Sequence, residues 1–441
     1  EQDSQHRGTF DFSGRVNRDQ RDLALSFNGT VDASDYPHNL SANIEQLSWQ
    51  LQGADLPPQG INGQGHLQAQ WLEEKKQLSF SQINLTANDS SFSGQAHVAL
   101  LEKPEWAVDL KFGQLNLDNL LVQHDAAVTA KGEVQQGQSQ STLARPVIAS
   151  QVDAVSYQGL KGFSADIALQ ADKVLWRKMA FENVSAKIDN RFGLLSIAQL
   201  QGKSDGGLIS LPGTLDARKG EPRAVFHPRL EGVEIGTILK AFDYPIALTG
   251  KLSLAGDFSG SDIDAQAFRH SWQGQAHVEM NDTRMEGMNF QQMIQQAVER
   301  SGGDAKAQQN MENVTRLDHF VTDMTLDNGE VTLDNMVGES AMLALTGKGT
   351  LDLVKQNCDT LFNIRVLGGW DGESKLINFL KATPVPLRVY GQWQSLNYSL
   401  QVDQLLRKHL QDEAKRRLND WADRNKDSRN GKDVKKLLDK L

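Results

Sequence analysis

The strongest constraint on this chain is a repeated phrase, in which apolar and polar residues alternate and the run closes on an apolar residue, one spacer and a glycine. Alternation places every second side chain on one face of a β-strand, so each phrase predicts a strand with one apolar and one polar side. The glycine permits a bend, a bulge or the close approach of a neighbouring strand. The phrase ends at Phe12–Gly14, Phe27–Gly29, Phe92–Gly94, Leu248–Gly250, Phe258–Gly260, Trp272–Gly274, Leu345–Gly347 and Val389–Gly391.

A long series of such strands must cover its apolar face with other protein or leave it open to a molecule that is not protein. The composition, 39% hydrophobic and 7% aromatic, is lean for a tightly filled core in a chain of 441 residues. We therefore predict a mainly β fold. It is an extended, twisted antiparallel β-sheet that forms a groove or an open, barrel-like taco, with a few short helices and a C-terminal α-helix.

The charge distribution excludes one class of partner. The net charge is −10, whereas a nucleic-acid-binding surface must be basic, so nucleic acid is not an expected partner. From Asp403 onward, however, 12 Lys and Arg stand against 8 Asp and Glu, a net of +4. Such a tail can attract anionic lipid or a partner surface, although a solvated helix is its commoner role.

The sequence says little about the cellular compartment in which the protein works. Cys358 is the single cysteine, so an intrachain disulfide is impossible. No run approaches the ~18 apolar residues of a membrane span, and no signal peptide is visible. Because the chain starts at Glu1 without a methionine, we expect targeting or anchoring residues to precede it.

Composition and breaker residues predict four segments: a repetitive β-sheet region over 1–145, a second β region over 146–228, a β region with short helices over 229–402, and a charged amphipathic helix with a tail over 403–441. The first boundary follows the polar stretch Gln135–Ser141. Asp327–Gly329 is the best hairpin signal. The short helices are expected to be capped by Thr237, Asn289 and Ser374, and the residues after Trp421 are expected to be loosely held.

Each motif in this sequence that could carry catalysis or bind metal has a simpler structural explanation. Gly202–Gly206 matches G-x-S-x-G by letter, but a strand follows it, which favours a simple β-turn over a nucleophile elbow. Asp423, Asn425 and Asp427 resemble the start of a calcium loop, yet Ser428 stands where the loop requires glycine. The histidines have no zinc-site spacing. We predict a non-enzymatic protein with no catalytic residues, no metal site and no cofactor.

Residues in the C-terminal third resemble the AsmA family. The resemblance is carried by Leu230–Ile235, Leu248–Leu254, Gly274–Val278, Met285–Asn289, Asp327–Val331, Leu345–Leu353 and Pro386–Gly391. These stretches are moderately specific as a set and cover roughly residues 229–402, where the enterobacterial member of the family is the best match. Residues 1–228 resemble the family only in their repetitive β texture.

The resemblance implies a protein on the periplasmic face of the inner membrane of a Gram-negative bacterium. Its relatives are bridge-like lipid transfer proteins tied to outer-membrane assembly and cell-envelope lipid homeostasis. The implied partners are phospholipid acyl chains, the membrane through an N-terminal anchor absent from this chain, and other envelope proteins. The family's proline after the last strand is replaced here by Ser395–Tyr398, which affects only the local turn.

Three functions remain open at this point. In the first, the apolar face binds acyl chains, and the residues that would line this lipid-binding wall are Leu23, Leu25, Phe27, Leu252, Leu254, Phe258, Val278, Leu387, Val389 and Trp393. In the second, the chain is a scaffold or chaperone-like module that offers strand edges to outer-membrane proteins. In the third, it is a β-solenoid acting on polysaccharide, for which no aromatic and carboxylate row is visible. The short helices near Phe290 and Leu376 are expected to pack on the sheet, or else to gate its end.

Overall fold

The computed structural model describes residues 6–122, 157–261, 263, 265–301, 305–308 and 312–440. In this part of the chain 22 strands belong to one hydrogen-bonded sheet, and the short β17 and β22 pair separately. The residues divide into two compact units, which we call unit 1 (residues 1–280 and 324–331) and unit 2 (residues 281–323 and 332–441). The predicted mainly β class, with one large sheet, a few short helices and a C-terminal helix, is confirmed.

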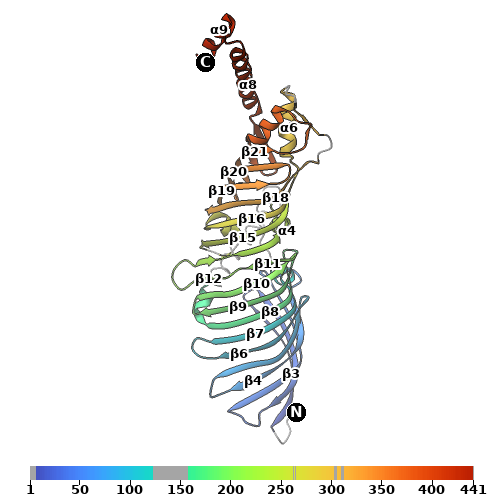
Figure 1. Cartoon of the computed structure of the whole chain (residues 1–441). Coiled ribbons are helices and arrows are strands. Elements are labelled where there is room, and N and C mark those ends of the chain that lie inside the picture. The colour runs from blue at the N-terminus through green and yellow to red at the C-terminus, as the bar shows by residue number, and fades with distance from the viewer. Residues whose placement is uncertain are drawn as a thin grey trace. The chain divides into compact units, whose positions relative to one another are not determined.

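Unit 1 is built from long, curved strands that lie side by side (Figure 1). Strands β1 to β7 pair antiparallel in chain order, and β8, β9 and β10 continue in the same way. The strands are β1 Arg7–Arg18, β2 Arg21–Asp32, β3 Asn39–Gly53, β4 Ile61–Leu72, β5 Gln77–Ala87, β6 Ser90–Ala99, β7 Glu105–Asn116, β8 Ser164–Trp176, β9 Met179–Arg191, β10 Leu194–Ser204, β11 Gly207–Ser210, β12 Gly213–Asp216, β13 Arg223–Phe226, β14 Arg229–Glu234, β15 Leu248–Gly260 and β16 Gln273–Glu286, whose last residues belong to unit 2.

One pair departs from the predicted antiparallel sheet. Strands β7 and β8 run parallel, with Val108 opposite Ile167. Parallel neighbours need a crossover of a dozen or more residues, and residues 117–163 supply that length. The predicted boundary at Gln135–Ser141 falls in this connection and lies outside the described residues.

Local signals in the sequence identified several turns and bulges correctly. Asp205 and Gly206, both at positive φ, join β10 to β11, so the G-x-S-x-G stretch is a β-turn as predicted. Asn328 and Gly329 form the same kind of turn between β18 and β19. The parity of the apolar residues changes in the sequence between Leu40 and Ile44 on one side and Leu47 and Trp49 on the other, which predicts a turn or bulge, and β3 has a bulge between Ile44 and Leu47.

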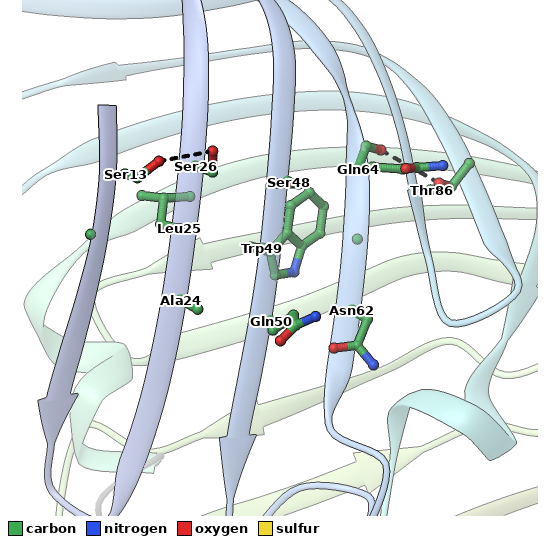
Figure 2. Close-up of a pocket in the computed structure, with 12 residues that line it drawn as sticks. Ser13, Ala24, Leu25, Ser26, Ser48, Trp49, Gln50, Asn62, Gln64 and Thr86 are labelled. Carbon is green, nitrogen blue, oxygen red and sulfur yellow. Dashed lines mark hydrogen bonds between the residues drawn. The ribbon is translucent and has the colours of Figure 1, made fainter. Parts of the chain in front are cut away.

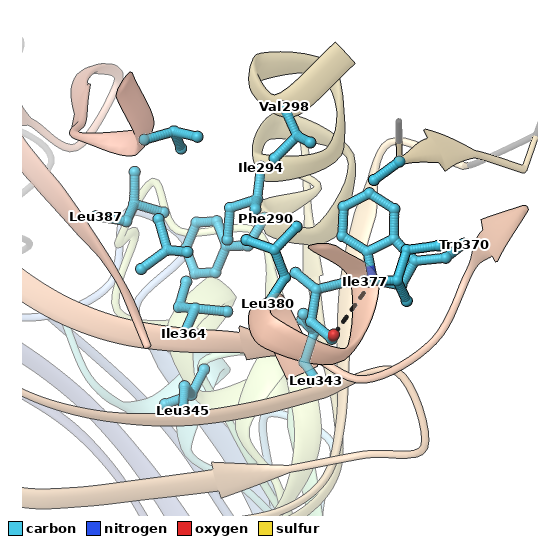
Figure 3. Packing of buried hydrophobic residues seen from close by; sticks show 14 of the residues in the cluster. Phe290, Ile294, Val298, Leu343, Leu345, Ile364, Trp370, Ile377, Leu380 and Leu387 are labelled. Carbon is cyan, nitrogen blue, oxygen red and sulfur yellow. Dashed lines mark hydrogen bonds between the residues drawn. The ribbon is translucent and has the colours of Figure 1, made fainter. Parts of the chain in front are cut away.

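Unit 2 carries the remaining strands and its own hydrophobic core (Figure 3). Helices α6 and α7 pack Phe290, Ile294 and Leu380 against residues of β20, β21 and β23, among them Leu387. Each of these four named residues is at most 1% exposed. The expectation that these helices pack on the sheet is confirmed. The strands are β17 Lys306–Ala307, β18 Val314–Asp327, β19 Glu330–Glu339, β20 Leu343–Asp352, β21 Asn357–Val366, β22 Trp370–Asp371, β23 Val385–Gln392 and β24 Ser395–Leu400, with β18 and β19 contributing to both units.

Two of the three predicted helix caps are confirmed. Asn289 and Ser374 accept hydrogen bonds from Gln292 and Ile377, as expected. Thr237 does not cap, because Glu234 accepts the N–H of Gly236 and the Thr237 hydroxyl donates to Asp205. The tail is not loose: α9 packs back on α8. The helical elements are α1 Leu117–Leu120, η2 Leu160–Gly162, α4 Ile235–Ala241, α5 Ala265–His270, α6 Phe290–Arg300, α7 Lys375–Ala382, α8 Val402–Arg424 and α9 Arg429–Leu438.

Cys358 reports on the integrity of unit 2. It lies on β21 between Leu351 of β20 and Gly391 of β23. Partial burial, and secondarily the charge of Asp359, raise the pKa of its thiol. At a given pH the folded protein therefore holds less thiolate than the unfolded chain, and alkylation, which requires the thiolate, is slower.

We expect Leu387→Ala to destabilise unit 2 by about 2–5 kcal/mol, because Leu387 is fully buried in the core. The measurement is the urea dependence of Cys358 alkylation, whose midpoint should fall. The matched control is Leu361→Ala on the neighbouring strand, where the side chain is 37% exposed. An equal fall in both variants would contradict the core described for unit 2.

Candidate functional site

Apolar residues of unit 1 line up across the sheet from strand to strand. Starting at Val31 on β2, each residue lies directly opposite the next through the pairings of β3 to β10, β12, β13 and β15, and none of them is polar. All but Gly213 and Phe258 are partly exposed. We call this set the apolar row: Val31, Ala42, Ala69, Phe80, Ala96, Val108, Ile167, Ile188, Ile197, Gly213, Phe226 and Phe258.

Parallel rows widen this surface on both sides. One runs from β1 to β9 and starts with a stacked pair of rings, Phe12 on Phe27, whose centroids lie 5.0 Å apart. Its members are Phe12, Phe27, Leu47, Gly65, Leu85, Phe92, Phe112, Ala171 and Val184. A row on the other side is interrupted by Asn190, whose buried amide donates to the carbonyls of Leu160 and Phe163 and so leaves no unpaired donor.

The reverse side of the same strands is polar and charged. The residues adjacent to the apolar row include Gln70, Ser79 and Asp166, and Asp166 receives a 2.8 Å hydrogen bond from Arg191 across β8 and β9. Hydrogen bonds from Arg218 lower the pKa of Asp216 to about 2, so this carboxylate stays ionised at any physiological pH. The reverse side is therefore the one that faces water.

Within the described residues, the apolar face of unit 1 is covered toward β15 and largely uncovered from β1 to β7, while α1, α4 and η2 contact β8, β9 and β10. Helix α4 packs on β15, where Leu252 is 5% exposed. Phe268 of α5 lies 6.1 Å from Phe258 and 5.9 Å from Trp272, ring centroid to ring centroid, and covers that end. On β1 to β10 the apolar residues are mostly partly exposed, and we call their surface the open face.

The structure distributes the ten predicted wall residues over different environments. Leu23, Leu25 and Phe27 lie on the open face of β2, opposite Leu51, Trp49 and Leu47 of β3. Leu252, Leu254 and Phe258 lie on the apolar side of β15, and Val278 on β16 is 9% exposed. Leu387 and Val389 lie inside the unit 2 core, at 0% and 4% exposed, and Trp393 lies in the turn after β23. Leu387 and Val389 are therefore covered by other side chains of unit 2.

Alternation alone predicted Leu23, Leu25 and Phe27 for this face but did not connect them with the apolar residues of more distant strands. Val108, Ile167 and Ile188 carry the same parity signal, yet their alignment depends on the parallel pairing of β7 with β8, which no local motif announces. The sequence therefore predicted the apolar side of each strand but not the alignment of these sides into one row.

A hollow of about 520 Å³ lies over β1 to β5 (Figure 2). It is open and lined mostly by polar-side residues such as Ser26, Gln50 and Gln64, and so it does not mark the open face. Figure 2 also shows Leu25 and Trp49 on neighbouring strands. The Trp49 ring extends over Gly63, where a Cβ would approach it within 2.0 Å, so glycine is needed at that position.

The described ranges lack two features that would indicate other kinds of function. No group of three or more His, Cys, Asp or Glu side chains there could hold a metal ion. None of the helices there combines the length and the apolar character that crossing a bilayer requires.

Comparison with known proteins matches this chain along its whole length. The model of the AsmA family matches residues 8–336. Protein AsmA of Escherichia coli (strain K12) is 72% identical over 441 residues, which is 100% of this chain and 72% of that protein. No solved structure matches. The resemblance to the enterobacterial family member, first seen in residues 229–402, is confirmed and extends to the repetitive strands before them.

We expect charge to be tolerated on the open face and not where that face is covered. Val108 is partly exposed, whereas Val233 on β14 is 2% exposed. Val233→Glu should therefore unfold unit 1 or lower its melting temperature strongly, because an unpaired buried carboxylate costs several kcal/mol. Val108→Glu should cost only about 1 kcal/mol, since water can reach the new carboxylate. An equal fall of the melting temperature in the two variants would show that the apolar face is covered at Val108 as well.

Proposed function

This chain belongs to the AsmA family, and we propose that it is a non-enzymatic, bridge-like phospholipid transfer protein. In this proposal it acts at the periplasmic face of the inner membrane of a Gram-negative bacterium, without a cofactor. Its acyl-chain traffic supports outer-membrane assembly and the lipid homeostasis of the envelope.

The observation that carries the proposal is the apolar row. Twelve strands place an apolar residue at the same level, and ten of these residues remain partly exposed. A monomeric soluble protein rarely leaves so much contiguous apolar surface in contact with water. A bound hydrocarbon would cover it.

An acyl chain suits this surface in both affinity and mobility. Each buried CH₂ contributes about 0.8 kcal/mol, so a single chain of lipid length supplies enough free energy to bind. The contacts are non-directional, and a chain that moves from Phe80 to Ala96 and on to Val108 breaks no hydrogen bond. The row runs across the strands, which makes it a continuous path.

The headgroup and the acyl chain have different requirements. The only polar side chain in the three rows described, Asn190, is buried and hydrogen-bonded within the protein. A phosphate would therefore gain little on the open face and would stay in water beyond its rim. This arrangement favours recognition of hydrocarbon over recognition of a particular headgroup.

A second candidate function is the scaffold that presents a strand to outer-membrane proteins. The observation in its favour is β1, on which Phe12 is 48% and Val16 59% exposed. An outer strand with exposed apolar side chains can accept an added strand through its backbone groups. This function would depend on the β1 backbone and not on the open face of β4 to β10.

The proposal is tested by photo-crosslinking from single positions in cells, followed by mass spectrometry of the crosslinked lipid. Probes at Leu25 and Val108 should capture phospholipid, whereas probes at their neighbours Ser26 and Ala107 should not, because these lie on the polar side. Val389 should also stay negative, since it is 4% exposed in the unit 2 core.

Two results would contradict lipid binding on the open face. The first is lipid crosslinking that is equal on the two sides of the sheet. The second is an organic extract of the purified protein that contains no phospholipid, together with silent probes at Leu25 and Val108. In that case crosslinks from Phe12 and Val16 to outer-membrane proteins would support the scaffold.

A further inference from the structure

The C-terminal helices of unit 2 form a hairpin with fixed faces. Helix α8 is anchored at its start by Val402 and Leu406, 2% and 5% exposed in the core, and His409 stacks on Phe379 of α7 at 4.1 Å between ring centroids. Helix α9 is capped by Ser428 and buries Leu438. Because both helices are held, the side chains that α8 turns away from unit 2 are determined by helical geometry.

One side of α8 exposes large apolar side chains. Leu410, Leu418 and Trp421 are 60%, 48% and 44% exposed. Their spacing of eight and eleven residues, with Ala414 between, places them within about 80° of one another around the helix axis. The buried Leu406 lies one turn before Leu410, so the stripe continues the row of Val402 and Leu406 along α8. Beyond Leu406 the leucines of this row are exposed.

Three arginines flank the stripe. Helical spacing places Arg407, Arg417 and Arg424 within about 80° of its centre. In the described residues none of them has an ion pair, whereas Arg416 pairs with Glu413 and Lys435 with Asp423. By the same spacing Asp412 and Asp423 lie on the far side of α8, and Glu413 and Asp420 lie about 100° and 120° from the centre of the stripe. The exposed side thus combines leucine, tryptophan and unpaired cations.

We propose that this side of α8, namely Leu410, Ala414, Leu418 and Trp421 with Arg407, Arg417 and Arg424, docks onto an anionic bilayer surface. Apolar side chains enter the boundary between headgroups and acyl chains, tryptophan lies at headgroup level, and arginines bind lipid phosphates. Since α8 carries too many charges to cross a bilayer, it lies in the plane of the surface.

The charge pattern argues against a second copy of the chain as the occupant. In an antiparallel contact centred on the stripe, Arg407 of one copy would approach Arg424 of the other. In a parallel contact each arginine would face itself. Both arrangements bring like charges together in a partly desolvated contact, and this costs free energy that an anionic surface would instead supply.

This docking surface is independent of lipid binding by the open face. It uses helix residues of unit 2, whereas the open face is formed by strands of unit 1. A protein that binds vesicles but carries no lipid would support docking through α8 and contradict lipid binding on the open face. A protein that carries lipid but does not bind vesicles would support lipid binding and contradict docking.

The test is flotation of the purified chain with vesicles of phosphatidylcholine containing about one-third phosphatidylglycerol, compared with phosphatidylcholine alone. We expect binding to the anionic vesicles only, and its release at high salt. Arg407→Glu, Arg417→Glu and Arg424→Glu together should weaken it on the order of a hundredfold or more. The control carries the same charge change on exposed lysines of unit 1, as Lys173→Glu, Lys187→Glu and Lys203→Glu, and should bind as before.

A second measurement separates insertion from general charge attraction. With Cys358→Ser, an environment-sensitive fluorophore on Leu418→Cys should shift to the blue on anionic vesicles, while the same label on Leu361→Cys should not. Equal loss of binding in the two triple variants, or equal shifts at the two labels, would overturn the proposal. So would a dimer in sedimentation equilibrium that Trp421→Glu abolishes without changing flotation.

Discussion

The register of strand pairing is the constraint on which unit 1 depends. Because side chains alternate between the faces, a slip of one residue would exchange Val108 for Ala107 and place Asp166 among the apolar residues. The chain keeps its apolar side chains together even where their parity changes. In β3 they switch from Ala42 and Ile44 to Leu47 and Trp49, and the bulge between Ile44 and Leu47 absorbs the extra residue.

The same alternating strand serves two purposes in the two units. In unit 2 the apolar side receives α6 and α7, and residues such as Ile364 and Leu387 become fully buried. In the described part of unit 1 the short helices α4 and α5 cover β15 and, through α4, a part of β9, and most of the earlier strands keep partly exposed apolar residues. The sealed side stabilises the fold, whereas the open side leaves apolar area to be buried by something else. In the proposed function this area is buried by hydrocarbon, whose contacts are non-directional.

Charge is as unevenly placed as apolar surface. The chain is acidic overall, with a net charge of −10, yet unpaired arginines gather beside exposed leucines and a tryptophan on α8. Global charge would repel an anionic membrane, so contact with one must be local and oriented. A protein that handles lipid on a sheet and meets a bilayer through a helix would separate the two tasks between different elements.

Local sequence was enough to determine four features, because each depends on neighbours a few residues away. Alternation predicted the mainly β class and the apolar parity of Leu23, Leu25 and Phe27, and capping and turn residues predicted the caps of α6 and α7 and the Asn328–Gly329 turn. Which apolar sides stay open was decided only by tertiary structure. Leu25 and Leu387 read alike in sequence, but one faces open space on β2 and the other lies beneath α6 and α7. The parallel pairing of β7 with β8, which joins the row, also depends on residues far apart in the chain. Burial is a property of what packs on a strand, and a strand's own alternation does not contain it.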